Sequence, residues 1–534
     1  MENIEKLRKE TAKKEGLNKI PKNIELNFLN PNLKIKTKPV RTISGVAPVA
    51  IMTRPEKCPH GKCTFCPGGP NSFFGNIPMS YTGNEPASMR AIRNKFDAYL
   101  QVFNRLEHYI LLNHIPEKVE LIIMGGTFPA YPIDYQDAFI QDAFKAMNDF
   151  SKLFFTNNKL NEKAFKDFFE FELDFKSKER EIKLLKKISD LKKSSTLEQE
   201  QIKNENSKIR CIALVIETKP DWCKQEHINQ MLKLGTTRVE LGIQTLNDSI
   251  LKKVNRGHSI QDSIEAIQLL KDSGLKFIAH MMPGLPLSTK EEDINNFKEL
   301  FSNQNYQPDG LKIYPCMVMP GTPLETLYNK KQFEPINTEE AGIIIKEAKK
   351  FFPKYTRVYR IQRDIPTKVT IAGVGITNFR QYIHQLMEKE NIQCNCIRCR
   401  EPKHKEINWN NVKLNRIDYD ASNGKEIFFS FDDNDIILGF IRLRIPYKPF
   451  REEINKDSAI IREIHVYGQA AKIGEKGEVQ HQGLGTQLLE KAESIAKKEF
   501  DIKKLLIISG IGVKEYFKKF DYQKDGVYVS KILR

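Results

Sequence analysis

Five short β-rich segments constrain the fold of this 534-residue chain more than any other feature. Each is apolar, ends in small or polar residues and is separated from the next by helical patterns; the segments cover residues 119–127, 211–218, 238–245, 276–284 and 310–315. Buried strands that alternate with helices are typical of parallel β/α units. The pattern therefore predicts an α/β domain, in which polar groups at the strand ends carry the chemistry.

Composition divides the rest of the chain into further regions. Residues 1–41 hold eleven Lys or Arg against five Glu, and form either a solvated tail or an RNA-contacting arm. The β/α domain takes residues 42–352, with a charged helical insertion expected at about 151–208. A linker, residues 353–410, follows it, and residues 411–534 return to β-rich segments with one amphipathic helix.

Charge and cysteine content restrict the class of protein. Lys and Arg number 85 against 68 Asp and Glu, a net charge of +17 that favours a polyanionic partner such as nucleic acid. No apolar run approaches the ~20 residues that cross a bilayer, and the charged start lacks a signal-peptide core. We therefore expect a cytoplasmic protein without membrane association. The nine cysteines include two tight clusters, which suit metals better than disulfides.

The first cysteine cluster consists of Cys58, Cys63 and Cys66, in CPHGKCTFCPGG. A closed structural zinc site needs four ligands, whereas a 4Fe-4S cluster held by three thiolates leaves one iron free to bind another molecule. The spacing alone therefore favours an iron–sulfur cluster, with zinc as the alternative.

These cysteines and several later motifs resemble the radical SAM superfamily and, within it, the catalytic subunits of Elongator. The motifs are SYTGNEPASMRAIR, MGGTF, ETKPDWC, NRGH, HMMPGLP, HVYG and QHQGLGTQLL, which together span nearly the whole chain. The four residues between the first two cysteines depart from the most common superfamily spacing, but longer gaps occur in this family. The resemblance implies a partial TIM-type barrel, joined through a metal-binding linker to a C-terminal GNAT-type acetyltransferase α+β domain.

The same resemblance implies roles for residues of the barrel. The three cysteines would hold a 4Fe-4S cluster that binds S-adenosylmethionine (SAM). The other implied residues are Gly125, Gly126 and Thr127 at the SAM amino group, Glu217 and Gln244 at the barrel mouth, and Lys118, which matches a family lysine linked to acetyl-CoA near the radical site. Taken alone, the glycines equally indicate a tight turn. Glu217 and Gln244 would then make only structural hydrogen bonds, and Lys118 would be an ordinary surface lysine.

A second cofactor site is predicted around Gln480, Gly483 and Gly485, which precede an amphipathic helix. Glycines there let a pyrophosphate approach free backbone N–H groups, although the same pair is common in plain loops. Similarity to GNAT acetyltransferases implies an acetyl-CoA site. Its implied residues are Glu463, Ile464, His465 and Val466 along the pantetheine arm, Leu484, Gly485 and Thr486 around the pyrophosphate, and Tyr516 with Phe517 near the thioester. The family usually has two tyrosines at the last pair, so only Tyr516 offers a hydroxyl here.

The second cysteine cluster, Cys394, Cys396 and Cys399, lies in the linker. Together with Cys316, which follows the last predicted barrel strand, it would complete a four-thiolate zinc site that joins the two domains. His404 is the competing fourth ligand, and a second iron–sulfur cluster is the main alternative.

The reaction implied by the resemblance modifies tRNA. Radical chemistry joins the methyl carbon of acetyl-CoA to C5 of a wobble uridine, and thioester hydrolysis leaves 5-carboxymethyluridine. The expected partner is the tRNA anticodon stem-loop, whose unpaired bases enter a pocket at modest cost, with other Elongator subunits or self-association as further options. Candidate RNA contacts, each equally explained by a salt bridge, are the basic arm, Arg90, Arg93, Arg357, Arg360 and Arg363.

Two other functions stay open on the sequence. A protein lysine acetyltransferase would use the barrel only as a scaffold and would need a general base near the thioester, for which Glu463 and His465 are candidates. A non-catalytic tRNA-binding module would have lost its cofactor sites, but all three cysteines of the first cluster and both glycines of the second site are present.

Overall fold

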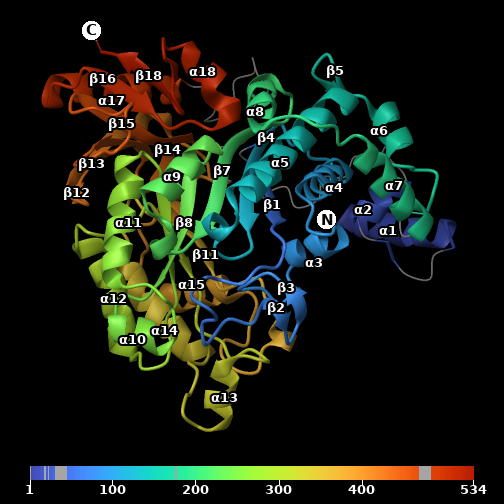
Figure 1. The fold of residues 1–534 in the computed structure, drawn as a ribbon, viewed down its shortest axis with the longest axis horizontal. Helices are drawn as coiled ribbons and strands as arrows, with labels where there is room; N and C mark the ends of the chain where they lie inside the picture. Colours follow the sequence, from blue (N-terminus) through green and yellow to red (C-terminus); the bar gives the residue numbers. More distant parts are fainter. Residues whose placement is uncertain are drawn as a thin grey trace.

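The computed structural model describes residues 2–16, 20–21, 23–29, 45–174, 177–403, 405–467 and 483–533. It has two domains, which pack end to end (Figure 1). The second domain, in orange and red, covers one end of a barrel-like first domain, and the helix α13 (Pro323–Asn329) lies at the opposite end.

A seven-stranded parallel sheet forms the first domain and confirms the predicted α/β architecture. In spatial order its strands are β1 (Val46–Met52), β4 (Lys118–Met124), β7 (Arg210–Thr218), β8 (Arg238–Gln244), β9 (Lys276–Met281), β10 (Gly310–Ile313) and β11 (Arg357–Ile361). All five predicted strands are present. Every residue of β8 is buried, as expected for a parallel strand covered on both faces.

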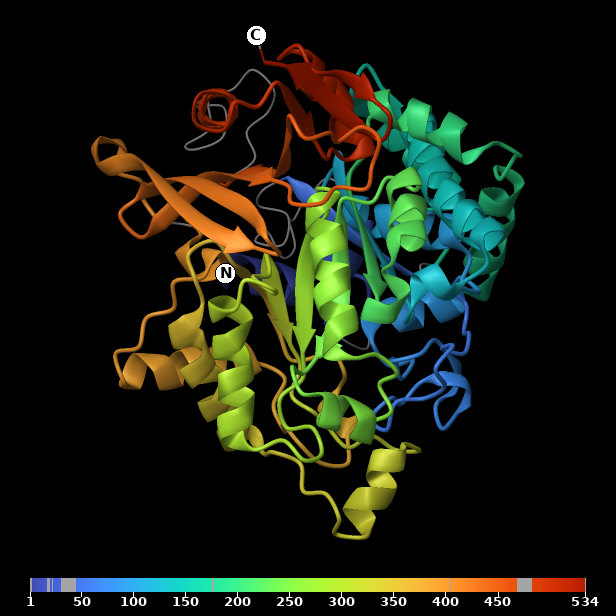
Figure 2. The same ribbon diagram turned by 60° about the vertical axis from the view of Figure 1, so that its left-hand side comes forward.

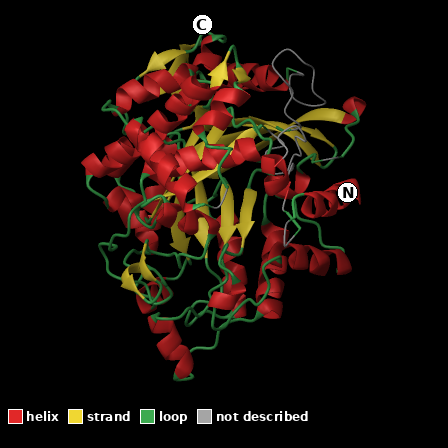
Figure 3. Cartoon of the chain, turned by 90° about the vertical axis from the view of Figure 1, so that its right-hand side faces the viewer, coloured by secondary structure: helices red, strands yellow, loops and turns green. Residues whose placement is uncertain are grey.

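Helices cover the outside of this sheet (Figure 3). Those of the first domain and linker are α3 (Pro86–Arg93), α4 (Ala98–Leu111), α5 (Ile133–Phe154), α9 (Gln225–Lys233), α10 (Asp248–Lys253), α11 (Ile260–Asp272), α12 (Lys290–Ser302), α14 (Thr338–Ala348), α15 (Phe379–Lys389) and α16 (Ile397–Arg400). Side-chain caps at Asp97, Ser259 and Thr289 begin three of them by accepting backbone N–H groups. Two N-terminal helices, α1 (Glu2–Lys14) and α2 (Asn23–Leu29), precede the sheet.

The sheet continues beyond Pro353, where the sequence pattern had suggested only a linker. Strand β11 pairs in parallel with β10, from Gly310 with Arg357 to Ile313 with Ile361. The sequence pattern did not indicate a strand here, because charged residues interrupt the apolar Val358 and Ile361, which face the core. The five residues of β11 therefore belong to the barrel rather than to a free linker.

The charged insertion packs firmly on the barrel through an aromatic inner face. It contains the short strands β5 (Phe155–Thr156) and β6 (Lys159–Leu160) and the helices α6 (Glu162–Phe168), α7 (Lys178–Asp190) and α8 (Leu197–Asn206). The rings of Phe154, Phe165 and Phe169 lie 4.6 to 5.5 Å apart between centroids. A buried ion pair of 2.8 Å between Arg180 and Glu107 ties α7 to α4.

The second domain is built on a mixed sheet with one long helix. Its strand order is β12 (Val412–Ala421), β13 (Gly424–Asp433), β14 (Ile436–Ile445), β15 (Ser458–Val466), β16 (Lys504–Ile507), β18 (Tyr528–Ile532) and β17 (Gln523–Asp525). Only β15 and β16 pair in parallel, and their pairing ends at Ile461 with Ile507. The predicted apolar face of α17 (Leu484–Phe500) is buried in the domain core, and α18 (Lys514–Lys518) follows β16. Figure 2 shows the long strands in orange above the barrel helices.

Buried ion pairs join the two domains. Arg462 of β15 donates to both carboxylate oxygens of Asp309, at 3.0 and 2.5 Å, and Arg444 of β14 donates to Asp272 at 2.8 and 2.5 Å. These four side chains are 0% exposed. Asp272 precedes β9 and Asp309 precedes β10, so the second domain packs on the N-terminal ends of the barrel strands. Because an unpaired buried charge is very costly, these pairs hold one docking orientation.

Candidate active site

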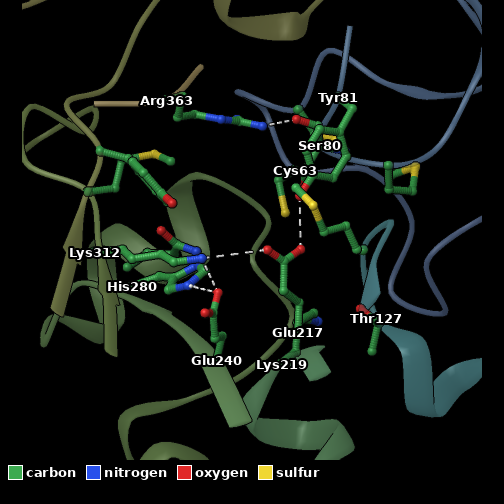
Figure 4. A pocket seen from close by; sticks show the side chains of 18 of the residues that line it. Cys63, Ser80, Tyr81, Thr127, Glu217, Lys219, Glu240, His280, Lys312 and Arg363 are labelled. Atoms are coloured by element: carbon green, nitrogen blue, oxygen red, sulfur yellow. Dashed lines mark hydrogen bonds and ion pairs between the residues drawn. The ribbon is translucent and has the colours of Figure 1, made fainter. Parts of the chain in front are cut away.

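A cavity opens at the C-terminal ends of the barrel strands, where the predicted cluster loop folds over the sheet (Figure 4). Cys58, Cys63 and Cys66 all line it. The short strands β2 (Gly69–Ser72) and β3 (Gly75–Ile77) follow the last of these cysteines as a hairpin. The three cysteines therefore face the same space as the polar groups at the ends of β4, β7 and β8.

Hydrogen-bond donors surround the cysteine sulfurs. Ser80 donates its backbone N–H to the Cys66 sulfur at 3.2 Å, and Arg256 lies 3.6 Å from the Cys63 sulfur. The His60 ring nitrogen Nε2 is 3.2 Å from the same Cys63 sulfur. Donors of this kind stabilise thiolates bound to a metal centre.

The spread of these sulfurs suits a cluster better than a single ion. Among the described side chains, only the linker cysteines gather three ligand atoms within 4.8 Å of one another. Tetrahedral zinc with bonds of about 2.3 Å draws its sulfurs to roughly 4 Å apart. The sulfurs of Cys58, Cys63 and Cys66 are more widely separated than this, which fits a larger iron–sulfur cluster.

The glycine-rich end of β4 and the end of β8 fit a small polar ligand next to the cysteines. Gly125 has a φ of +129°, and a Cβ there would lie 2.1 Å from the Thr53 hydroxyl, so only glycine fits. Gly126, Thr127 and Gln244 line the cavity. The Gln244 Oε1 atom is buried and has no hydrogen-bond partner among the described residues, so it is available to accept a hydrogen bond from a ligand.

The floor of the cavity carries a charged group to which the sequence analysis gave no role, although His280 opens the motif HMMPGLP. Glu240 of β8 accepts from the His280 Nε2 atom at 3.1 Å and forms an ion pair with Lys312 of β10 (Figure 4). Nearby, the Tyr81 hydroxyl donates to Glu217 at 2.9 Å. Burial alone would raise the pKa of Glu240, but Lys312 and His280 lower it well below its usual value, so Glu240 is ionised.

Polar side chains continue from this floor down the inside of the barrel. Arg238 lies 3.5 Å from Glu240 and 2.5 Å from Glu120 of β4, and its guanidinium is 4.9 Å from the Tyr359 ring centroid. Because β4, β8 and β11 are not neighbours in the sheet, these contacts cross the barrel lumen. Lys276 lies 5.7 Å from the same ring and pairs with Glu463 of β15. The contacts thus run from the cavity to the second domain.

The predicted acetyl-CoA residues gather around the point where β15 and β16 diverge. Val466 ends β15, and a Cβ on Gly485 would lie 3.7 Å from it and 3.8 Å from the Tyr516 hydroxyl. Gly483 precedes α17 with a φ of +78°, followed by Leu484 and Thr486 in the first turn. Ile464 and His465 belong to the same end of β15, and burial lowers the pKa of His465 to about 4. Gln480 lies outside the described residues.

The structure separates the predicted pair Tyr516 and Phe517. Tyr516 is 42% exposed beside Gly485, whereas Phe517 is 3% exposed and packs in the domain core with Leu488 and Tyr522. Phe517 therefore anchors α18 in the domain core. Of the two residues, only Tyr516 faces the surface near the predicted acetyl-CoA site.

Lys118 does not reach the radical cavity. It is the first residue of β4, where it pairs with Val46 and Arg210, and it is exposed. The cavity lies at the other end of that strand, beyond Met124. Lys118 stands instead at the end of the barrel that faces the second domain. Desolvation and the neighbouring Arg210 lower the pKa of Lys118.

The linker cysteines form a compact site, but Cys316 is not part of it. The sulfurs of Cys394, Cys396 and Cys399 lie within 4.8 Å of one another, which suits a zinc ion. Ile397 donates its backbone N–H to Thr356, just before β11 begins, whereas Cys316 follows the end of β10 and packs with Cys63. The start of β11 and the end of β10 lie at opposite ends of the parallel sheet. The predicted four-thiolate site that includes Cys316 is therefore wrong. His404 lies outside the described residues.

The arginines predicted to contact RNA have different surroundings. Arg90 is buried and donates to the Ala50 carbonyl at 2.6 Å, and Arg357 pairs with Glu401 at the domain interface, so both are structural. Arg93 is exposed. Arg360 and Arg363 line the cavity. Of the basic arm, residues 30–41 lie outside the described part of the chain.

Sequence reasoning gave no role to Glu240, His280 and Lys312, although His280 opens the motif HMMPGLP. The signal that all three share is a charged or titratable residue at an alternate position within an otherwise buried strand, in RVELGIQ, KFIAHM and GLKI. A buried charge in a parallel strand is costly, so it marks a position that faces either the lumen or a partner charge.

Comparison with known proteins agrees with this two-domain arrangement. Residues 52–300 match the Radical SAM superfamily, residues 308–389 the Radical_SAM C-terminal domain, and residues 385–522 the Acetyltransferase (GNAT) family. The first match implies a 4Fe-4S cluster and SAM. Across the described part of the chain, no helix has the length and apolar character needed to span a membrane.

Similar proteins cover nearly the whole chain. It is 48% identical over 510 residues to a tRNA uridine(34) acetyltransferase from Methanocaldococcus infernus, covering 93% of this chain and 88% of that protein. Human Elongator complex protein 3 is 36% identical over 552 residues, with 99% and 93% covered. The solved structure of the M. infernus Elp3 with an N-terminal deletion matches with a TM-score of 0.75 and 42% identity, covering 92% of this chain and all of that one. This chain therefore belongs to the family of tRNA uridine(34) acetyltransferases and Elongator complex protein 3.

Proposed function

We propose that this protein converts a wobble uridine of tRNA into 5-carboxymethyluridine, with acetyl-CoA as the carbon donor. The observation that carries the proposal is the line of polar contacts through the barrel, which links the radical cavity to the predicted acetyl-CoA strand. A protein lysine acetyltransferase that uses the barrel only as a scaffold would not need polar contacts between the two sites. The relatives named for uridine 34 of tRNA support the choice of base.

The radical cofactors would be held by the residues of the cavity. Cys58, Cys63 and Cys66 would bind the cluster, while Thr127 and the unpartnered Gln244 would contact SAM. When bound, these groups supply a carbon radical that removes hydrogen from an unactivated C–H bond.

The second domain would bind acetyl-CoA along the free end of β15. Glu463 to Val466 extend beyond the last β15–β16 pair, so their backbone is available to the pantetheine arm. The N-terminus of α17 would receive the pyrophosphate, because the first backbone N–H groups of a helix have no partner within the helix itself. The linker triad of cysteines would hold zinc near the domain interface.

The cavity residues would hold the uracil ring and exclude water from it. Arg363 donates to the Ser80 carbonyl and lies 5.8 Å from the Tyr81 ring centroid, which fixes the wall of the cavity. Arg360 is 40% exposed at the same wall and would meet the RNA backbone. A base of the anticodon loop is unpaired and can be turned into such a pocket.

Anaerobically reconstituted protein, incubated with tRNA, SAM, acetyl-CoA and a reductant, tests the proposal. Mass spectrometry of the digested tRNA should detect 5-carboxymethyluridine that is absent without SAM and with Cys63→Ser. A protein lysine acetyltransferase would instead retain its activity in Cys63→Ser, and a binding module would retain only tRNA affinity. Absence of the nucleoside from protein with an intact cluster would refute the proposed reaction.

A further inference from the structure

The proposed reaction leaves a hydrolytic step without a catalyst. The new carbon–carbon bond forms at the methyl carbon of acetyl-CoA, which is bonded directly to the thioester carbonyl. Because the two atoms are one bond apart, a cavity that holds the methyl group also holds the thioester. The group that activates water for hydrolysis must therefore line the cavity, and this inference rests on the proposed function.

Most proton acceptors of the cavity are already engaged. The engaged groups are Glu85 with Thr82 and Ser88, Glu217 with Tyr81, Asp364 with Arg360, and His60 with Lys219 and Cys63. Glu240 accepts from His280 and is paired with Lys312 and Arg238. His280 is different, because within the described part of the chain only one of its two ring nitrogens has a hydrogen-bond partner.

The surroundings of His280 fix which nitrogen carries the proton. Its Nε2 atom lies 3.1 Å from the ionised Glu240 carboxylate, so Nε2 keeps the hydrogen and donates it. The lone pair of Nδ1 then has no hydrogen-bond partner among the described residues, and the ring lines the cavity. The Tyr314 ring, at 5.4 Å and 81°, packs against the imidazole edge-on and holds its plane. Burial, opposed by Glu240, lowers the pKa of His280, so the ring is neutral.

We propose that His280 is the general base for thioester hydrolysis and that Glu240 is its positioning residue. The Nδ1 atom takes a proton from water as the water oxygen bonds to the thioester carbonyl carbon. Collapse of the tetrahedral species breaks the carbon–sulfur bond, and the imidazolium returns the proton to the departing CoA thiolate. The products are CoA–SH and a carboxylic acid, which releases its remaining proton to solvent to give the carboxylate, so the step needs no oxidant or reductant.

Lys312 completes this arrangement by keeping Glu240 charged. Its ammonium group pairs with Glu240 and lies 3.9 Å from Glu217. An ionised Glu240 accepts the His280 hydrogen and stabilises the imidazolium that forms during the step, as a carboxylate behind a catalytic histidine does.

His280→Gln tests the proposal, because its amide can still donate to Glu240 but cannot accept a proton. The full-length variant is incubated anaerobically with tRNA, SAM, acetyl-CoA and a reductant, and acid-quenched samples are analysed by mass spectrometry. We expect 5′-deoxyadenosine to form while hydrolysis slows by about 100-fold or more, so that uridine still joined to CoA through its thioester accumulates. His280→Gly with added imidazole should restore 5-carboxymethyluridine.

His227→Gln is the matched control, because His227 lies on the outer helix α9, away from the cavity. Native rates of 5-carboxymethyluridine formation in His280→Gln would overturn the assignment. So would loss of 5′-deoxyadenosine without any CoA-linked uridine, which would place His280 before the hydrolytic step. If the native protein itself forms no modified uridine, the proposed function fails rather than the role of His280.

Discussion

Substituting Glu463 by glutamine tests how strongly the barrel and the second domain are coupled. Glu463 pairs with Lys276 of the barrel and accepts from Arg442 at 2.9 Å. Burial alone would raise its pKa, but these two cations lower it from 4.5 to about 2. Each pKa unit is worth about 1.4 kcal/mol, so the carboxylate contributes about 3 kcal/mol to folding at neutral pH. Loss of one partner from a buried pair costs a similar amount, about 3–5 kcal/mol.

The effect should depend on pH in a defined direction. Because the pKa of Glu463 is lower in the folded state, its stabilisation is complete above pH 4.5 and is lost as pH falls towards 2. Urea unfolding of native protein and Glu463→Gln, followed by circular dichroism, should therefore differ by about 3 kcal/mol at pH 7 and converge at acidic pH. Hydrogen exchange should locate the loosening at β15 and at the start of β9.

Glu390→Gln provides the control, because Glu390 is 51% exposed in its ion pair with Lys346. Exposed pairs contribute about 1 kcal/mol or less. A stability loss in Glu463→Gln no larger than that of the control would refute the reasoning, as would a difference between native and variant protein that stays constant from pH 7 to acidic pH.

Four further substitutions test other parts of the fold and site. Gly125→Ala should lower the unfolding free energy by about 1–3 kcal/mol in urea titrations, because a Cβ would clash with the Thr53 hydroxyl at a positive φ. Cys396→Ser should lower the zinc content measured by metal analysis while leaving the iron content unchanged, since the two cysteine clusters lie at opposite ends of the sheet. Phe517→Ala should cost about 3–5 kcal/mol, whereas Tyr516→Ala, at an exposed position, should cost little; equal losses would contradict the separation of this pair.

The sequence was sufficient for the order and type of the main elements. Apolar β-rich runs ending in small residues correspond to β4, β7, β8, β9 and β10, because strands buried on both faces need continuous apolar sequence. The sequence could place the glycines after β4 and the first cysteine cluster at one edge of the sheet for the same reason: they follow strand ends, and parallel strands end at one edge. These are local properties, which adjacent residues carry.

Contacts between residues on different strands of the barrel could not be predicted from the sequence in the same way. Cys316 was assigned to the linker triad because its thiol follows the last predicted barrel strand, yet the direction of β10 carries it to the cluster end of the sheet. The His280–Glu240–Lys312 group comes from three strands, and its meeting point depends on lumen geometry that no single segment encodes. Strand β11 was missed because its arginines face the lumen and the domain interface rather than solvent.

The barrel lumen is unusual because charged side chains fill its centre. Barrels of this kind are normally filled with branched apolar side chains, whereas here Arg238, Glu240 and Lys312 meet across the centre. Buried charges are costly, so an apolar filling would hold the fold at least as well. Strand β8 spans roughly 20 Å at about 3.3 Å per residue, which is the separation between its two ends. The charged lumen residues therefore place hydrogen-bonding groups along this distance, from the cavity at one end to Glu463 of the second domain at the other.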